Sequence, residues 1–179
     1  MKRILLCLAL ALPAPVFAAG SDDPVVTKPK ETKTSKECKG VKVWDEDKNR
    51  CVRPKQSSLT PQELGQAVRE LAYAGRFEDA QGVLRALPDQ TSDLALTYWG
   101  FTTRKLGDVN AGLVFYGDAI NRNPDNILAR SYLGQVHVEA GRMMAARTQL
   151  NEIVARGGAG TWAETSLRRA IATGQTYNY

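Results

Sequence analysis

The chain has 179 residues, and its 24 lysines and arginines outnumber its 19 acidic residues to give a net charge of +5. Residues 59–179 hold twelve basic and twelve acidic residues, so the positive excess lies before them. A balanced charge over that stretch argues against a nucleic-acid-binding domain, which presents a basic face. The length suits one folded domain with a tail.

The first residues have the pattern of a secretory signal peptide. Lys2 and Arg3 form a basic start, Ile4–Leu12 is an apolar run, and Val16–Ala18 ends in a small residue typical of a cleavage site. The apolar run is too short to span a bilayer, which takes about 20 residues. We therefore predict a signal peptide over residues 1–18, a periplasmic or secreted location and no integral membrane span.

The next segment, residues 19–37, is predicted to be a disordered linker. Between Ser21 and Lys36 it mixes lysine, proline, threonine, serine and acidic residues, and Val25–Val26 is its one apolar pair. Such a composition cannot bury enough apolar surface to offset the entropy of ordering. A plain spacer is the favoured interpretation, and a basic tether for anionic envelope polymers is the alternative.

Two cysteines follow the predicted signal peptide, Cys38 and Cys51. An even pair in an oxidising compartment predicts a disulfide, and two free thiols are the alternative if the chain is not exported. Valines on both sides of Asp45–Asn49 favour two strands and a turn, so residues 38–52 are predicted to be a disulfide-closed hairpin. We expect Trp44 to pack on the disulfide or on the helical body. A glycine and an aromatic residue between paired cysteines resemble one cysteine loop of peritrophin-type chitin-binding modules, which implies glycan stacking as the alternative role of Trp44.

Residues 59–173 are predicted to form helices, and residues 174–179 a C-terminal tail. The first helix starts at a capping box of Thr60 and Glu63, and the last starts at a second capping box of Thr161 and Glu164. Apolar residues recur between these points at the helical period of 3.6 residues. Pro88 and the glycine-rich run Gly157–Gly160 interrupt the helical pattern.

Three glycines divide this region into helix pairs. Gly75, Gly107 and Gly141 lie 32 and 34 residues apart, each between two predicted helices. A regular interval of this size is typical of a solenoid of helical repeats. The last predicted helix has no partner after it, and we interpret it as the cap of the stack.

The units resemble the tetratricopeptide repeat, whose pattern is Trp-x2-Leu-Gly-x2-Tyr, then Ala-x3-Phe, then Pro within 34 residues. The middle unit reads Leu96-x2-Trp99-Gly100-x2-Thr103, then Gly112-x3-Tyr116, then Pro124, and the third reads Arg130-x2-Leu133-Gly134-x2-His137, then Ala146-x3-Leu150. The resemblance implies an all-α fold, a short right-handed α-solenoid of two to three helix pairs plus a C-terminal capping helix.

The resemblance also implies where a partner would bind, because in the family the first helix of each pair lines a concave groove. The implied partner-binding residues are Arg69, Tyr73, Tyr98, Phe101, Arg104, Lys105, Ser131, Tyr132 and Gln135. The alternative is that Tyr98 and Tyr132 pack between helices, while Arg104 and Lys105 are merely solvated.

Little in the sequence suggests catalysis. His137 is the one histidine of the chain, and no spacing of metal ligands or phosphate-binding loop is recognisable. We therefore predict no catalytic residue, no metal and no cofactor. The predicted function is non-catalytic binding of another envelope protein or peptide. The alternatives are self-association through the terminal helix that carries Trp162, or association with the cell wall through the basic tail and the hairpin.

Overall fold

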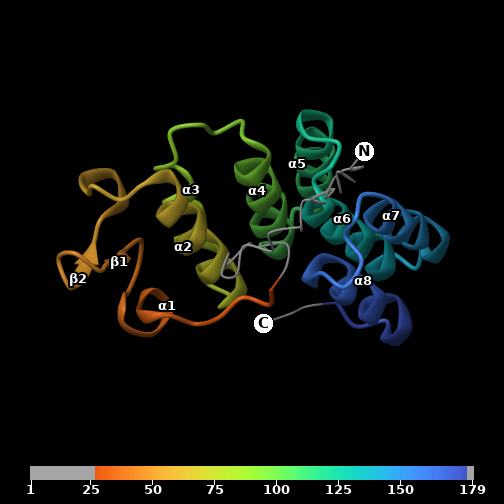
Figure 1. Cartoon of the computed structure of the whole chain (residues 1–179), viewed down its shortest axis with the longest axis horizontal. Coiled ribbons are helices and arrows are strands. Elements are labelled where there is room, and N and C mark those ends of the chain that lie inside the picture. Colours follow the sequence, from red (N-terminus) through yellow and green to blue (C-terminus); the bar gives the residue numbers. More distant parts are fainter. Residues whose placement is uncertain (1–26, 177–179) are drawn as a thin grey trace, which may run out of the picture.

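The computed structural model describes residues 27–176, which form eight α-helices and one two-stranded hairpin (Figure 1). The mostly helical content confirms the predicted all-α class. The elements are α1 Lys33–Glu37, β1 Val43–Asp45, β2 Arg50–Val52, α2 Pro61–Tyr73, α3 Phe77–Leu84, α4 Asp93–Lys105, α5 Val109–Arg122, α6 Ile127–Glu139, α7 Met143–Ala155 and α8 Trp162–Thr173.

Some predictions concern residues outside the described range. They are the signal peptide over residues 1–18, the first part of the linker over residues 19–26, and residues 177–179 of the tail. Among the described helices, none has the length and apolar character needed to cross a membrane.

The two predicted capping boxes differ in the structure. At the start of α2, the Thr60 side chain accepts from the Glu63 amide and the Glu63 carboxylate accepts from the Thr60 amide, so the box is complete. At the start of α8, Thr161 accepts from the Glu164 amide, but the Glu164 carboxylate accepts from Arg168 instead. The second box is half formed because a cation four residues along the helix competes for the carboxylate.

The three glycines end the first helix of each pair. Gly75, Gly107 and Gly141 have φ angles of +74°, +107° and +70°, a region that residues with a Cβ seldom adopt. The residue after each glycine donates its amide to a carbonyl five residues earlier, on Leu71, Thr103 and His137 respectively. This is the Schellman arrangement, which satisfies carbonyls at a helix end.

Consecutive helices pack against one another along the chain (Figure 1). The contacts join α2 to α3, α4 to α5 and α6 to α7, and α3 and α5 also contact the helices that follow them. Helix α8 packs on α6 and α7 at one end of the molecule. Glycines permit the closest approaches: a Cβ added to Gly100 would lie 2.7 Å from the Tyr116 ring, and one added to Gly134 would lie 2.5 Å from Leu167.

The linker differs from the prediction, because its described part is ordered against the helical body. Thr32 caps the short helix α1, and the buried Glu70 carboxylate on α2 accepts from the Thr32 amide at 2.6 Å and the Ser35 amide at 2.8 Å. The prediction considered apolar burial alone. Here the segment is held by hydrogen bonds to the Glu70 carboxylate and from the Arg69 and Arg76 side chains to its carbonyls. Charge-assisted bonds of this kind are about twice as strong as neutral ones.

The cysteine hairpin forms and is docked on the helices. Strands β1 and β2 pair antiparallel with Trp44 opposite Cys51, and Cys38 is bonded to Cys51. The Arg76 guanidinium at the start of α3 donates to the carbonyls of Cys38 at 2.7 Å and Gly40 at 2.9 Å. The hairpin and α1 therefore cover the end of the helical body opposite to α8 (Figure 1).

Trp44 has a half-buried position beside α1. Its backbone amide donates to the Thr34 hydroxyl at 3.1 Å, and the Lys33 ammonium lies 4.4 Å from the centroid of its ring. These contacts give Trp44 a structural role in joining the hairpin to α1.

Candidate functional site

Side chains from α2, α4, α6 and α8 meet in one aromatic cluster. The Phe101 and Tyr132 rings have centroids 4.8 Å apart, and those of Tyr73 and Phe101 are stacked at 5.6 Å. The hydroxyls of Tyr73 and Tyr132 share a hydrogen bond, and the Trp162 indole donates to the Tyr73 hydroxyl at 3.2 Å. The first helices of the three pairs, α2, α4 and α6, and the last helix, α8, thus contribute to one face.

The aromatic members of the predicted groove are buried. Tyr98 and Phe101 are 0% exposed, Tyr132 1% and Tyr73 6%. Burial raises the pKa of both the Tyr98 and Tyr132 phenols well above the ordinary value. Tyr98 and Tyr132 thus pack between helices, in agreement with the alternative given for these two residues. Both lie on first helices of their pairs, the helices from which the predicted groove was built.

The basic members of the predicted set lie at the same face. Arg104 is buried, not solvated, and its Nη1 contacts a Glu139 carboxylate oxygen at 2.8 Å. Lys105 is half-buried. Arg69 is buried and donates to the Thr27 carbonyl.

Two of these charged groups have shifted pKa values. Burial, together with the neighbouring Arg104 cation, lowers the pKa of Lys105 to about 8, against the opposing effect of Glu139. Burial alone would raise the pKa of Glu139, but the hydrogen bonds and charges of Arg104, Thr176 and Lys105 lower it overall. The face therefore combines an ion pair between the buried Arg104 and the exposed Glu139 with a Lys105 amine whose pKa is unusually low.

The two remaining predicted residues, Ser131 and Gln135, are also completely buried on α6. The Ser131 hydroxyl lies 3.1 Å from the Ser166 hydroxyl on α8, so this residue joins two helices instead of facing a partner. Gln135 lies one turn further along α6.

Sequence reasoning missed two contributors to this face, Glu139 and Trp162. The N-caps Ser92, Asn126 and Thr161 lie 34 and 35 residues apart, so α8 starts where a further first helix would start. Trp162 could therefore have been assigned to the same face as Tyr98. Trp162 is only 9% exposed and donates to Tyr73 of its own chain, while self-association through α8 stays a prediction.

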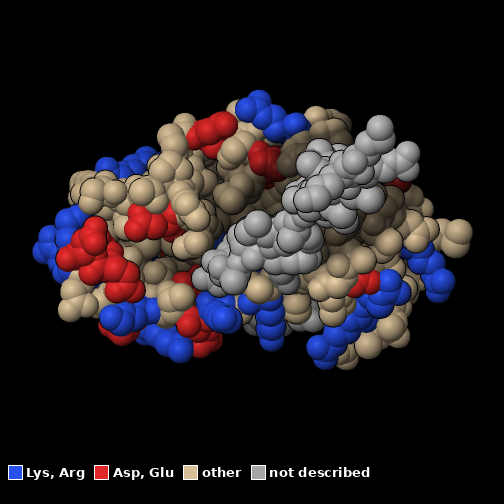
Figure 2. Space-filling model, viewed as in Figure 1, with Lys and Arg blue, Asp and Glu red and all other residues tan. Residues whose placement is uncertain are grey.

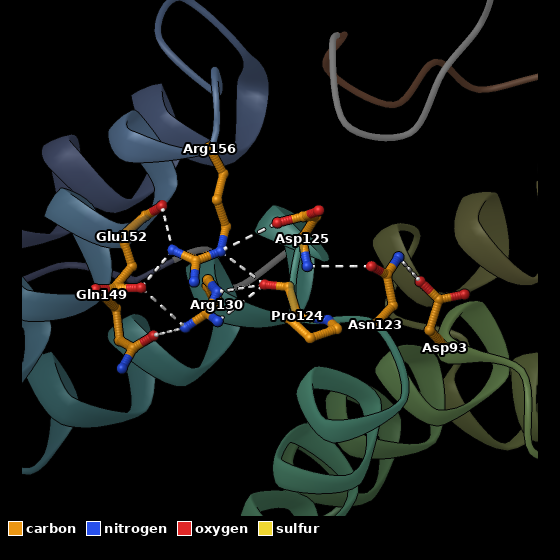
Figure 3. Close-up of polar contacts among 8 residues, drawn as sticks. All are labelled: Asp93, Asn123, Pro124, Asp125, Arg130, Gln149, Glu152 and Arg156. Atoms are coloured by element: carbon orange, nitrogen blue, oxygen red, sulfur yellow. Dashed lines mark hydrogen bonds and ion pairs between the residues drawn. The ribbon is translucent and has the colours of Figure 1, made fainter.

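A second polar cluster surrounds the loop between α5 and α6 (Figure 3). The Pro124 carbonyl accepts from Arg130 Nη2 at 2.9 Å and from Arg156 Nε at 2.8 Å, while the Asn123 amide donates to Asp93 at 2.6 Å. These bonds join the loop after α5 to α4 on one side and to α6 and the end of α7 on the other. Because the polar groups satisfy one another, we interpret the cluster as structural.

The described residues contain no group of three or more histidine, cysteine, aspartate or glutamate side chains that could hold a metal ion. His137 is half-buried, and its Nδ1 accepts from Arg142 Nε at 3.1 Å. Burial, and then the Arg142 charge, lower the pKa of His137, which favours the neutral ring.

Comparison of the chain with protein-family models, with curated proteins and with solved structures finds no match. The resemblance to the tetratricopeptide repeat therefore stays a prediction from residue spacing.

Proposed function

We propose that the protein is an exported, non-catalytic binding module built as a short solenoid of tetratricopeptide-like helix pairs. On this proposal α8 caps one end, and the face shared by α2, α4, α6 and α8 holds a segment of another envelope protein. The observation that supports it best is the convergence of Tyr73, Phe101, Tyr132 and Trp162 from four helices separated by up to 89 residues.

The packing between paired helices supports the repeat assignment. The family places a glycine in the first helix of a pair and a small residue in the second. A Cβ on Gly100 would lie 3.1 Å from the Gly112 carbonyl oxygen, and one on Gly112 would lie 3.0 Å from the Gly100 carbonyl oxygen. These two positions touch across α4 and α5, as that pattern requires.

The residue types on the face shared by α2, α4, α6 and α8 suit the binding of another protein better than catalysis. Aromatic and arginine side chains are enriched where proteins bind one another, and the energy concentrates on a few of them. In this proposal the buried rings form a rigid floor, and Lys105 and Glu139 lie at the rim. The Cys38–Cys51 bond is compatible with a periplasmic or secreted location, where disulfides persist.

The test is site-specific photocrosslinking in living cells. A photoreactive residue at Lys105 should capture a partner, while the same residue at Arg147, an exposed position on α7, should not. Phe101→Ala should reduce capture at Lys105 because it removes part of the floor. Equal capture at both positions, or none at Lys105, would contradict the proposal. Capture of a second copy of the chain would favour self-association instead.

A further inference from the structure

A concave site lies between the hairpin and α3, and none of its lining residues belongs to the aromatic cluster. It is a pocket of about 500 Å³ formed by three separate segments. Residues 39–42 precede β1, residues 53–56 follow β2, Gly82 lies on α3, and Arg85 is the C-cap of α3. The volume falls within the range of about 300–1,000 Å³ that is usual for ligand sites.

The pocket is lined by five cations and by no acidic residue. The cations are Lys39, Lys42, Arg53, Lys55 and Arg85. All five are exposed, and none of them has an ion-pair partner among the described residues, whereas the nearby Lys48 and Arg76 are each paired with an aspartate. In Figure 2 basic side chains gather along the edge of the molecule that carries the hairpin, with acidic side chains beside them. Unpaired like charges around a concave surface focus a positive potential into it.

The backbone that carries these cations is fixed in three ways. Cys38, next to Lys39, is tied to Cys51 by the disulfide. The Arg76 guanidinium holds the Cys38 and Gly40 carbonyls. Val41 packs so closely on α3 that a Cβ added to Gly82 would lie 2.4 Å from it. Because the supporting chain is held before any ligand arrives, binding costs less ordering entropy than on a flexible tail.

We propose that this pocket binds an acidic peptide segment, supplied by a partner protein. The positive charges fit aspartate and glutamate side chains, and Val41, which is 39% exposed among them, offers an apolar contact for a residue between the acids. The Gln56 side chain can pair with a peptide backbone. None of the lining residues is aromatic, so the pocket offers no ring on which a nucleobase could stack and no platform for a sugar. The site does not depend on the aromatic face, so either proposal can fail alone.

The test measures binding of the full-length, oxidised protein to a fluorescein-labelled pentapeptide of four glutamates around a central leucine. Fluorescence anisotropy should give saturable binding that weakens as salt rises, since the pocket charges are exposed to solvent. The double variant Lys42→Gln with Arg53→Gln should raise Kd about tenfold or more, because two unit charges are lost from the site. Arg85→Gln, on the opposite wall, should weaken binding separately.

The matched control removes two charges elsewhere. Arg147→Gln with Arg169→Gln lowers the net charge equally, and both arginines are exposed on α7 and α8. It should leave Kd within about twofold, as expected for distant charges screened by salt. An equal loss in both double variants would show diffuse attraction and overturn the site. Absence of peptide binding, or binding of polygalacturonate through Lys42 and Arg53 in place of the peptide, would overturn the peptide assignment.

Discussion

At the scale of single residues, a buried carboxylate accepts several of the hydrogen bonds that hold the segment before the hairpin. Glu70 is 8% exposed and accepts from the Thr32 amide, the Thr32 hydroxyl and the Ser35 amide at 2.6–2.8 Å. Hydrogen bonds to charged groups contribute about 1.5–3 kcal/mol each. A polar segment with few apolar residues is thereby fixed in place.

Glu70→Gln should therefore release α1 while leaving the helical body folded. An amide cannot accept from three donors with the strength of a carboxylate, so trypsin should cleave after Lys33 and Lys36 about tenfold faster or more. Mass spectrometry of a digestion time course measures the rates. Glu78→Gln is the control, because Glu78 is an exposed glutamate on α3. Similar cleavage rates in the two variants would contradict this account of the linker.

Lys105 predicts a pH dependence of stability. Its pKa is lowered from the ordinary value of 10.5 to about 8, chiefly by burial. Between these two pH values the unfolded chain binds more protons than the folded one, so the free energy of unfolding should rise with pH through this window. Below about pH 8 both states carry the charge, and the cost of burying it is fully present.

The measurement is urea unfolding at pH 7.5 and pH 9.5 for the protein and for Lys105→Met. The unsubstituted protein should gain stability at the higher pH relative to the variant, which lacks the titrating amine. A parallel pH dependence in the two proteins would assign the effect to other groups.

At the scale of elements, glycines on one helix set how closely the neighbouring helix can approach. Gly134 on α6 is covered by the Leu167 side chain of α8, and a Cβ there would lie 2.5 Å from the nearest carbon. Gly117 on α5 has nothing within 4 Å of the place a Cβ would take. Both positions are helical glycines, but only Gly134 is in contact with a neighbouring helix.

Gly134→Ala should destabilise the protein by about 1–3 kcal/mol, because overpacking forces α8 away from α6 or Leu167 into a poor rotamer. Gly117→Ala should stabilise it by up to about 1 kcal/mol, because alanine is the better helix former. Thermal and urea unfolding followed by circular dichroism compare both. Stabilisation by both substitutions would contradict this account, because it would mean that α6 and α8 accommodate the added methyl group without loss of stability.

At the scale of the whole molecule, the sequence predicted what depends on neighbours along the chain. Gly75, Gly107 and Gly141 indicated turns because the left-handed conformation favours glycine, and Thr60 indicated a helix start because its cap is local. The prediction of a disordered linker before Cys38 was wrong over its described part, since Glu70 lies 38 residues from Thr32 and no local pattern joins them.

In the candidate site too, the sequence predicted the local features but not those that depend on distant parts of the chain. Helical spacing placed Tyr73, Tyr98 and Tyr132 on first helices, but it could not predict how deeply they are buried, because burial depends on helices brought together from distant parts of the chain. The basic pocket was also beyond prediction, since residues 39–56 and α3 meet only after the hairpin docks.

The hydrogen bond between Trp162 and Tyr73 has a consequence for how the molecule comes apart. In a stack whose units contact only their neighbours, the ends can fray independently and unfolding spreads from one unit to the next. Here a residue of α8 bonds to a residue of α2, 89 positions away. Loss of α2 or α8 therefore removes a partner from the other, which favours cooperative unfolding in one step. In a variant with Trp44 and Trp99 replaced, Trp162 fluorescence would report whether both helices are in place.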